Sequence, residues 1–220
     1  MSITFEEVKK NPAIRAYIKK ADESLIALGY TEHSFAHVTR AAQTARHILL
    51  ETGHTERLAE LAAIAAFLHD IGNVVNRVAH ERTGALLAFS LLKDMGADPD
   101  DIATVITAIG NHDETTAFPV NDVAAALIIA DKTDVRRTRV RNKETIELDI
   151  HDRVNYAVEK SGLSVNAGDR EILLRLTIDT KISAISDYFE IFLSRMLLCR
   201  RAAEKLGMAF GLVINDQRLM

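Results

Sequence analysis

The apolar stretch Leu61–Leu68 is followed directly by a histidine and an aspartate, His69 and Asp70. The stretch is apolar on nearly every face of a helix, which is typical of a central, buried helix. An imidazole and a carboxylate are costly to bury without a partner, and a metal ion would supply one to both. The sequence therefore predicts a fold built around this helix, with a polar site at its C-terminal end.

Residues 1 to about 135 show helical patterns throughout. Potential N-cap residues precede the apolar periodicity at several points, and a proline follows two of them. The caps are Asn11 (before Pro12), Thr31, Thr55, Asp98 (before Pro99) and Asn121. The corresponding helices are expected at about 12–28, from Thr31 through Leu49, at 56–70, at about 80–95, from Pro99 onward, and through Ala124 to Asp131.

The pattern changes after about residue 145. In Glu171–Asp179, apolar and polar residues alternate with the period of two that is typical of a strand. The other elements expected here are a short helix at about 149–160, strands at Leu163–Val165 and Ala209–Ile214, and a long helix at about 181–206. We therefore predict a mainly α fold, in which a helical bundle (residues 1–145) carries a small C-terminal α+β layer (residues 146–220) packed on it.

Composition narrows the functional classes. A net charge of −4 gives no general attraction to nucleic acid. The one cysteine, Cys199, excludes an intramolecular disulfide framework, and its apolar neighbours indicate a core thiol. The first residues lack the apolar stretch of a signal peptide, and the longest apolar runs are too short to cross a membrane. We therefore expect a cytoplasmic protein without membrane partners, and the sequence leaves open whether it forms a homo-oligomer.

Histidine and aspartate side chains recur at helix ends and on helix faces through the helical region. Both hold catalytic metals while leaving positions open for water and substrate. The set consists of His37, His69, Asp70, His80, His112 and Asp131. Six ligands are enough for two metal ions, and their chemistry suits Fe, Mn, Co, Ni or Zn better than Ca.

The order of these residues, H…HD…H…H…D, resembles the HD superfamily of metal-dependent phosphohydrolases. Shorter strings carry the same resemblance over about residues 31–141. They are H-x-x-R at His37–Arg40, H-D-I-G at His69–Gly72, H-x-x-x-G-A at His80–Ala85, and A-D at Ala130-Asp131. The resemblance implies an HD-domain fold with two metals, in which Asp70 is the bridging and catalytic carboxylate and His80 and His112 are the additional ligands.

The activity that the resemblance implies is hydrolysis of a phosphate ester, a nucleotide or another small phosphorylated metabolite, by metal-activated hydroxide. Asn73 stands where many related sequences have lysine. Asn111-His112 stands where the cyclic-dinucleotide subfamily has two histidines, and the Gly-Tyr-Pro signature of that subfamily is absent. These departures argue against a three-metal site and against cyclic-di-GMP as substrate.

Basic residues cluster after Asp131, and guanidinium groups bind phosphate through paired hydrogen bonds. The cluster comprises Lys132, Arg136, Arg137, Arg139, Arg141 and Lys143. If the helix continues past Asp131, one face of it carries Lys132, Arg136 and Arg139. We predict that these three bind substrate together with His33, one helical turn before His37, and Arg40. The cluster lacks interleaved aromatic residues, which argues against a nucleic-acid groove.

Two other functions remain open from the sequence. A few HD-fold proteins bind two irons and cleave carbon bonds with oxygen, so bound iron and oxygen uptake would indicate an oxygenase. A sensor module would bind nucleotide tightly without turnover. A second histidine–aspartate pair, His151-Asp152, lacks both the apolar helix before it and the Ile-Gly after it, so we expect no ligand role there.

Overall fold

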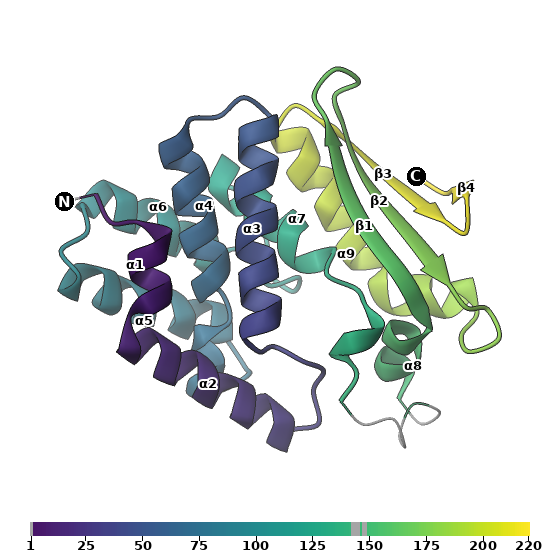
Figure 1. The fold of residues 1–220 in the computed structure, drawn as a ribbon, viewed down its shortest axis with the longest axis horizontal. Helices are drawn as coiled ribbons and strands as arrows, with labels where there is room; N and C mark the ends of the chain where they lie inside the picture. The colour runs from purple at the N-terminus through teal and green to yellow at the C-terminus, as the bar shows by residue number, and fades with distance from the viewer. Residues whose placement is uncertain (1, 142–145, 147–148) are drawn as a thin grey trace.

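The computed structural model describes residues 2–141, 146 and 149–220. Helices α1 to α7 come first in the chain and lie together, whereas α8, the sheet and α9 follow on the other side of the molecule (Figure 1). The first group comprises α1 (Phe5–Lys10), α2 (Pro12–Ala27), α3 (Phe35–Glu51), α4 (Glu56–Leu68), α5 (His80–Asp94), α6 (Pro99–Gly110) and α7 (Asp122–Lys132). The predicted mainly α fold with a small C-terminal α+β layer is confirmed.

The N-caps explain where most of these helices begin. Asn11, Thr55, Asp98 and Asn121 each accept a hydrogen bond from a backbone amide in the first turn of the helix that follows, as predicted. The predicted cap Thr31 is wrong, because Ser34 caps α3 by accepting a bond from the Ala36 amide. The sequence offered several hydroxyl and carboxylate side chains before this helix, and local signals did not distinguish them.

Two apolar helices form the centre of the core. The predicted central stretch Leu61–Leu68 of α4 is buried over its whole length, and so is Val123–Ala130 of α7. Helix α3 packs against both. Because both helices are buried on every face, their C-terminal ends lie deep in the molecule. The polar residues His69, Asp70 and Asp131 are found at these ends.

The C-terminal layer contains α8 (Ile150–Ala157), α9 (Ile185–Lys205) and a sheet with strand order β1-β2-β3-β4. The strands are β1 (Val158–Asn166), β2 (Glu171–Ile178), β3 (Ala209–Ile214) and β4 (Gln217–Arg218). Strand β2 is antiparallel to β1 and parallel to β3, so α9 forms the crossover between β2 and β3. Helix α9 packs against β3 and against α7, which joins the layer to the helical core.

Several element boundaries differ from the prediction. Strand β1 begins at Val158, so the helix expected to continue to residue 160 ends at Ala157 instead. Pairing with β2 explains the difference, because Lys160, Ser161 and Gly162 lie opposite Thr177, Leu176 and Arg175 in the antiparallel ladder, and this tertiary pairing overrides the local helical preference. Helix α9 begins at Ile185, later than expected, while α1, β4 and the 3₁₀ turns Ile71–Val74 and Arg137–Arg139 were not predicted.

Two sequence predictions fall partly on residues outside those described. The domain boundary proposed between residues 145 and 146 adjoins residue 145, which is not among the described residues. Lys143 of the basic cluster is also outside them. Among the described helices, none combines the length and hydropathy that a membrane span requires.

Candidate metal centre

The six predicted ligands meet at one place, where the ends of several helices converge. His69 is the C-cap of α4 and Asp70 follows it, while His80 is the first residue of α5. His37 lies in α3, His112 follows the last turn of α6, and Asp131 lies in the last turn of α7. Their ligand atoms form three overlapping groups, each with all atoms within 4.8 Å of one another. The groups are His37–His69–Asp70, His69–His112–Asp131 and Asp70–His80–His112.

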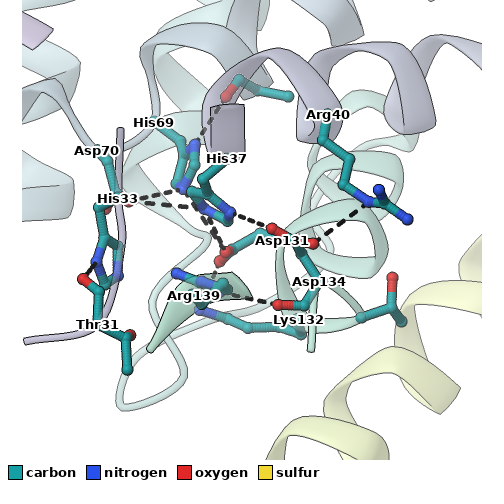
Figure 2. Close-up of polar contacts among 12 residues, drawn as sticks. Thr31, His33, His37, Arg40, His69, Asp70, Asp131, Lys132, Asp134 and Arg139 are labelled. Atoms are coloured by element: carbon teal, nitrogen blue, oxygen red, sulfur yellow. Dashed lines mark hydrogen bonds and ion pairs between the residues drawn. The ribbon is translucent and has the colours of Figure 1, made fainter. Parts of the chain in front are cut away.

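The Asp70 carboxylate directs its two oxygens toward different imidazoles. Oδ2 lies 3.2 Å from His69 Nε2 and 3.8 Å from His37 Nε2, and Oδ1 lies 3.5 Å from His80 Nε2. Asp131 Oδ1 lies 3.4 Å from His37 Nε2 and 3.6 Å from His69 Nε2. Figure 2 shows His37, His69, Asp70 and Asp131 directed toward a common centre.

Each of the four histidines is anchored through Nδ1, so that Nε2 faces the centre. His80 Nε2 also accepts a hydrogen bond from Arg77 Nη1 at 3.3 Å. His69 Nδ1 donates to the Ala66 carbonyl at 2.7 Å, His112 to Ile109 at 2.6 Å and His80 to Arg77 at 3.1 Å. These acceptors each lie three residues earlier in the chain, Ala66 and Ile109 within helices and Arg77 in the turn before α5, so the local backbone fixes the three rings. His37 Nδ1 instead donates to the Asp134 carboxylate at 2.7 Å. Metal-binding histidines are commonly oriented by such bonds.

Within the described part of the chain, three buried atoms of this cluster form no hydrogen bond: His37 Nε2, His69 Nε2 and Asp70 Oδ2. Unpaired buried polar atoms are costly, and three of them facing one another is unusual. A divalent cation would bind all three at once, and nitrogen and oxygen donors of this kind suit Zn and the transition metals. The residues present therefore fit a metal.

The charges of the cluster are strongly coupled. Burial opposes a charge on His69, but the Asp70 and Asp131 carboxylates outweigh it and raise the pKa of His69 to about 10. Burial and the nearby His69 and Lys132 charges lower the pKa of His112 to about 3. Although burial alone would raise the pKa of Asp70, His69 and the other imidazoles hold it well below its usual range. Burial alone would also raise the pKa of Asp131, but Lys132 and His69 hold it well below its usual range. Both carboxylates are therefore ionised and favour a cation between them.

Two glycines allow the H-D-I-G turn to pack directly on the start of α5. A Cβ on Gly72 would collide with the His80 carbonyl oxygen and the Gly84 amide, which are backbone atoms. A Cβ on Gly84 would lie 3.2 Å from the His69 carbonyl oxygen. Gly84 of the H-x-x-x-G-A string therefore packs directly on Gly72 of the H-D-I-G string, and this close approach brings His80 next to Asp70. The backbone of Gly72 is not left-handed, so the close packing, and not the backbone conformation, is the reason for glycine at this position.

A cavity of about 440 Å³ opens beside the cluster. Asp70, His80, His112 and Asp131 lie on its wall. Cationic and imidazole side chains also line it: His33, Arg77, Lys132, Arg139, His151 and Arg195. Carboxylates of Glu114, Asp134, Asp149 and Asp152 line it as well, so an anionic ligand would be bound by particular donors and not by a uniformly positive wall.

The five residues predicted to bind substrate fall into two groups. His33, Lys132 and Arg139 line the cavity, whereas Arg40 and Arg136 are absent from its wall. Asp134 lies between Arg40 and the centre (Figure 2). Its Oδ2 accepts the hydrogen bond from His37 Nδ1, and its Oδ1 lies 3.4 Å from Arg40 Nε. Arg136 pairs instead with Glu32 and Asp134, at 2.8 and 2.9 Å.

The condition behind part of that prediction does not hold. Helix α7 ends at Lys132, so Lys132, Arg136 and Arg139 do not share one helical face. Arg139 reaches the cavity through the fold of the following segment, where it donates to the Glu32 and Asp134 carbonyl oxygens. His33 lies before α3 and not within it, yet its ring packs edge-on against His37 with centroids 5.6 Å apart.

Sequence reasoning missed several residues of the site. Asn73 donates to the Asp70 carboxylate at 2.9 Å and helps to fix it, and Asp134 orients His37. Arg195 and Glu114 line the cavity from α9 and from the α6–α7 loop. His151, dismissed with Asp152, also lies on the cavity wall, although neither belongs to a metal-ligand group. An acidic residue three positions after Asp131 was the one signal that could have identified Asp134.

A family model of the HD domain matches residues 34–156, more than half of the chain. The chain belongs to the HD domain family. One similar solved structure comes from an uncultured Thermotogales bacterium and is described as a predicted HD superfamily hydrolase. It shares 26% identity, the match covers 60% of this chain and 73% of that one, and the TM-score is 0.43. No curated protein matches the chain significantly.

HD domains bind divalent metals, and the three histidine–aspartate groups of this chain are compatible with that property. Family membership together with these groups indicates a metal-dependent hydrolase of the HD type. The matched segment continues through α8, so it includes the predicted ligands and the first helix of the C-terminal layer.

Proposed function

We propose that this protein is a phosphohydrolase that holds two divalent transition-metal ions and cleaves the phosphate ester of a nucleotide or another small phosphorylated metabolite. The ligands would be the six residues of the three overlapping groups: His37, His69, Asp70, His80, His112 and Asp131. Fe, Mn, Co, Ni and Zn are the candidate metals.

The geometry of Asp70 is the observation that carries the proposal. Its two oxygens face different imidazoles, His69 through Oδ2 and His80 through Oδ1, which is the arrangement expected of a carboxylate shared between two cations. The six histidine and aspartate ligands are more than one metal ion with an open position for water needs. We assign Asp70 as the bridging and catalytic carboxylate for this reason.

Phosphate is favoured by the donors around the cavity. Lys132 is buried, and its ammonium lies 2.7 Å from Asp131 Oδ2, directly beside the ligands. Arg139 uses Nε and Nη1 for backbone carbonyls, which leaves Nη2 without a hydrogen bond to the described residues. Charged donors that are already held in place bind anionic oxygens well.

The bound metals would lower the pKa of a water molecule and neutralise the phosphoryl oxygens. The chain's own residues do the rest. The anchored imidazoles keep the centre rigid, Lys132 and Arg139 orient the phosphoryl group, and His33 covers His37 from the cavity side.

Elemental analysis of protein reconstituted separately with each candidate metal, followed by a phosphoester panel, tests the proposal. We expect about two metal equivalents per chain, since six ligands exceed one site, and turnover of at least one phosphate ester. A variant with His37 and His112 both replaced by alanine should lose metal and activity, while His47→Ala, at an exposed position on the same helix as His37, should lose neither.

The panel also separates the rival functions. A count of one metal or fewer would remove the two-metal centre and reassign His80 and His112 to substrate contact. Oxygen uptake without phosphoester hydrolysis would establish the oxygenase instead. Tight nucleotide binding without turnover across all five metals would establish a sensor.

A further inference from the structure

Helix α9 lies outside the segment matched by the HD family model, yet two of its side chains reach the central cavity. Arg195 and Phe192 line the cavity wall from α9, which packs against α7, the helix that carries Asp131. Figure 1 shows α9 next to α7, with the sheet on its other side. The C-terminal layer therefore supplies part of the wall around the candidate metal centre.

Arg195 is oriented by Glu114, and one edge of its guanidinium is left available. Its Nε and Nη2 both donate to Glu114 Oε1, at 3.1 and 2.9 Å. The guanidinium carbon lies 4.8 Å from the centroid of the Phe192 ring, so the group also contacts an aromatic residue. Nη1 makes no hydrogen bond with the described residues, and the side chain is 25% exposed. A ligand in the cavity can therefore reach an oriented guanidinium.

Glu114 is shared between Arg195 and Lys132. Its Oε2 lies 3.2 Å from the Lys132 ammonium without hydrogen-bond geometry, and no other described residue forms a hydrogen bond with it. Lys132 in turn contacts Asp131 at 2.7 Å. One carboxylate thus faces two cations, and only one of these cations touches a candidate metal ligand.

This difference separates the two cations by function. Among the described residues, the ion pairs of Arg195 involve Glu114 alone, whereas Lys132 pairs directly with Asp131. An anion bound by Lys132 would lie beside the ligands, where a reacting phosphate belongs. An anion bound by Arg195 would lie one side chain further away, where a non-reacting part of the substrate would extend.

We propose that Arg195 binds a second anionic group of the substrate while the reacting phosphate lies at the metal centre. This inference rests on the proposed phosphohydrolase function and specifies its substrate class as phosphate esters that carry a further phosphate or a carboxylate. The Arg195–Glu114 pair is partly exposed, and such pairs contribute little, so an incoming anion can replace Glu114 on the guanidinium.

Non-hydrolysable phosphonates test the inference without relying on turnover. The probes are methylphosphonate, which has one anionic group, and phosphonoacetate and phosphonopropionate, which add a carboxylate at two distances. Calorimetry with the metal-reconstituted full chain should show at least one of the two-anion probes binding about tenfold more tightly than methylphosphonate, a difference of about 1.4 kcal/mol. Arg195→Ala should reduce that preference to less than about twofold and leave methylphosphonate affinity and metal content unchanged.

Arg195→Lys and Arg200→Ala complete the series. Lysine keeps the charge but loses the forked donor geometry, so it should restore part of the preference. Arg200 is exposed on the same helix, and its replacement should leave the preference intact. Circular dichroism establishes that each variant keeps its helices.

The outcomes distinguish this inference from the proposed function. If the metal-loaded protein binds no phosphonate at all, the phosphohydrolase proposal fails. If methylphosphonate binds but an added carboxylate brings no gain, or if Arg195→Ala weakens all three probes equally, the second-anion site is wrong and the function stands.

Glu114→Gln tests the exchange step separately. Removing the charge of Glu114 frees the guanidinium from a competing anion, so affinity for the preferred two-anion probe should rise by about twofold or more. A fall in that affinity would show that Glu114 positions Arg195 for the ligand and would overturn the exchange.

Discussion

The metal centre and the C-terminal layer hold their polar side chains in different ways. At the centre, four histidines are buried and each has its Nδ1 bonded to a carbonyl or a carboxylate. In the layer, Arg195 and Arg153 reach across to carboxylates through side chains that are 25% and 28% exposed. Buried groups with fixed partners keep one geometry, whereas partly exposed ion pairs are more easily exchanged.

The difference suits two tasks. Hydrolysis needs ligands held within a fraction of an ångström, and helix ends buried in the core supply that precision. Discrimination between substrates needs contacts that can vary without disturbing the ligands, and a layer packed on the cavity from outside supplies these. Changes in the helical core should therefore abolish activity, and changes in the layer should alter selectivity.

Replacement of the shared carboxylate should have the largest effect. We expect Asp70→Ala to lower kcat by about 100-fold or more and to reduce metal content, because a bridging carboxylate positions both cations and the nucleophile. Steady-state kinetics, elemental analysis and circular dichroism together measure this. Retention of more than about a tenth of kcat, a loss of only roughly 1.4 kcal/mol, would contradict the bridging role.

Two glycines, one from each region, give a matched comparison of packing. Gly72→Ala should destabilise the protein by about 3 kcal/mol and reduce metal content, because the added Cβ meets the backbone of α5 and must separate His80 from Asp70. Gly162→Ala in β1 should change stability by less than about 1 kcal/mol, because no atom lies within 4 Å of its Cβ position. Urea unfolding measures the free energy of unfolding of both variants. Equal losses of stability would contradict the proposed role of close packing at Gly72.

Removing the carboxylate that orients His37 should weaken the centre without dismantling it. Asp134→Asn is expected to lower metal affinity by about 10- to 100-fold, since the amide accepts a weaker bond from His37 Nδ1. Glu32→Gln is the control, because Glu32 pairs with Arg136 in the same network and no bond joins it to His37. Similar affinities for the two variants, measured by competition with a chelator, would argue against the orienting role.

Metal affinity should rise with pH. The Asp70 and Asp131 carboxylates raise the pKa of His69 to about 10, so without metal this imidazole carries a proton at neutral pH. A metal binds the neutral ring and must displace that proton, so apparent affinity should increase up to about tenfold per pH unit below this pKa. Titrations in buffers of different ionisation enthalpy count the released protons, and a count near zero between about pH 7 and 8 would contradict the shift.

Three of the six predicted ligands, His69, Asp70 and Asp131, follow strong local signals, whereas His37, His80 and His112 were predicted from the resemblance to the HD superfamily. Leu61–Leu68 and Val123–Ala130 are apolar on every face, so the polar residues that follow them had to enter the interior. By contrast, Arg136 was predicted to bind substrate from its helical spacing after Asp131, yet it lies outside the cavity wall, because helix α7 ends at Lys132 and spacing does not fix side-chain direction beyond the end of a helix. Arg40 of the H-x-x-R string also lies outside the wall, because it pairs with Asp134.

The sequence by itself determined the helical core and the residues that enter it, because apolar periodicity and cap residues act over a few neighbouring positions. Only the tertiary structure decided how His37 is oriented by Asp134, why Gly72 must be small, and that Arg195 reaches the cavity from α9. Each of these depends on segments far apart in the chain, and the packing of α3, α5 and α9 on the core brings them together. Local patterns bring His69, Asp70 and Asp131 into the interior, and packing between distant elements decides how they are held and what lies beside them.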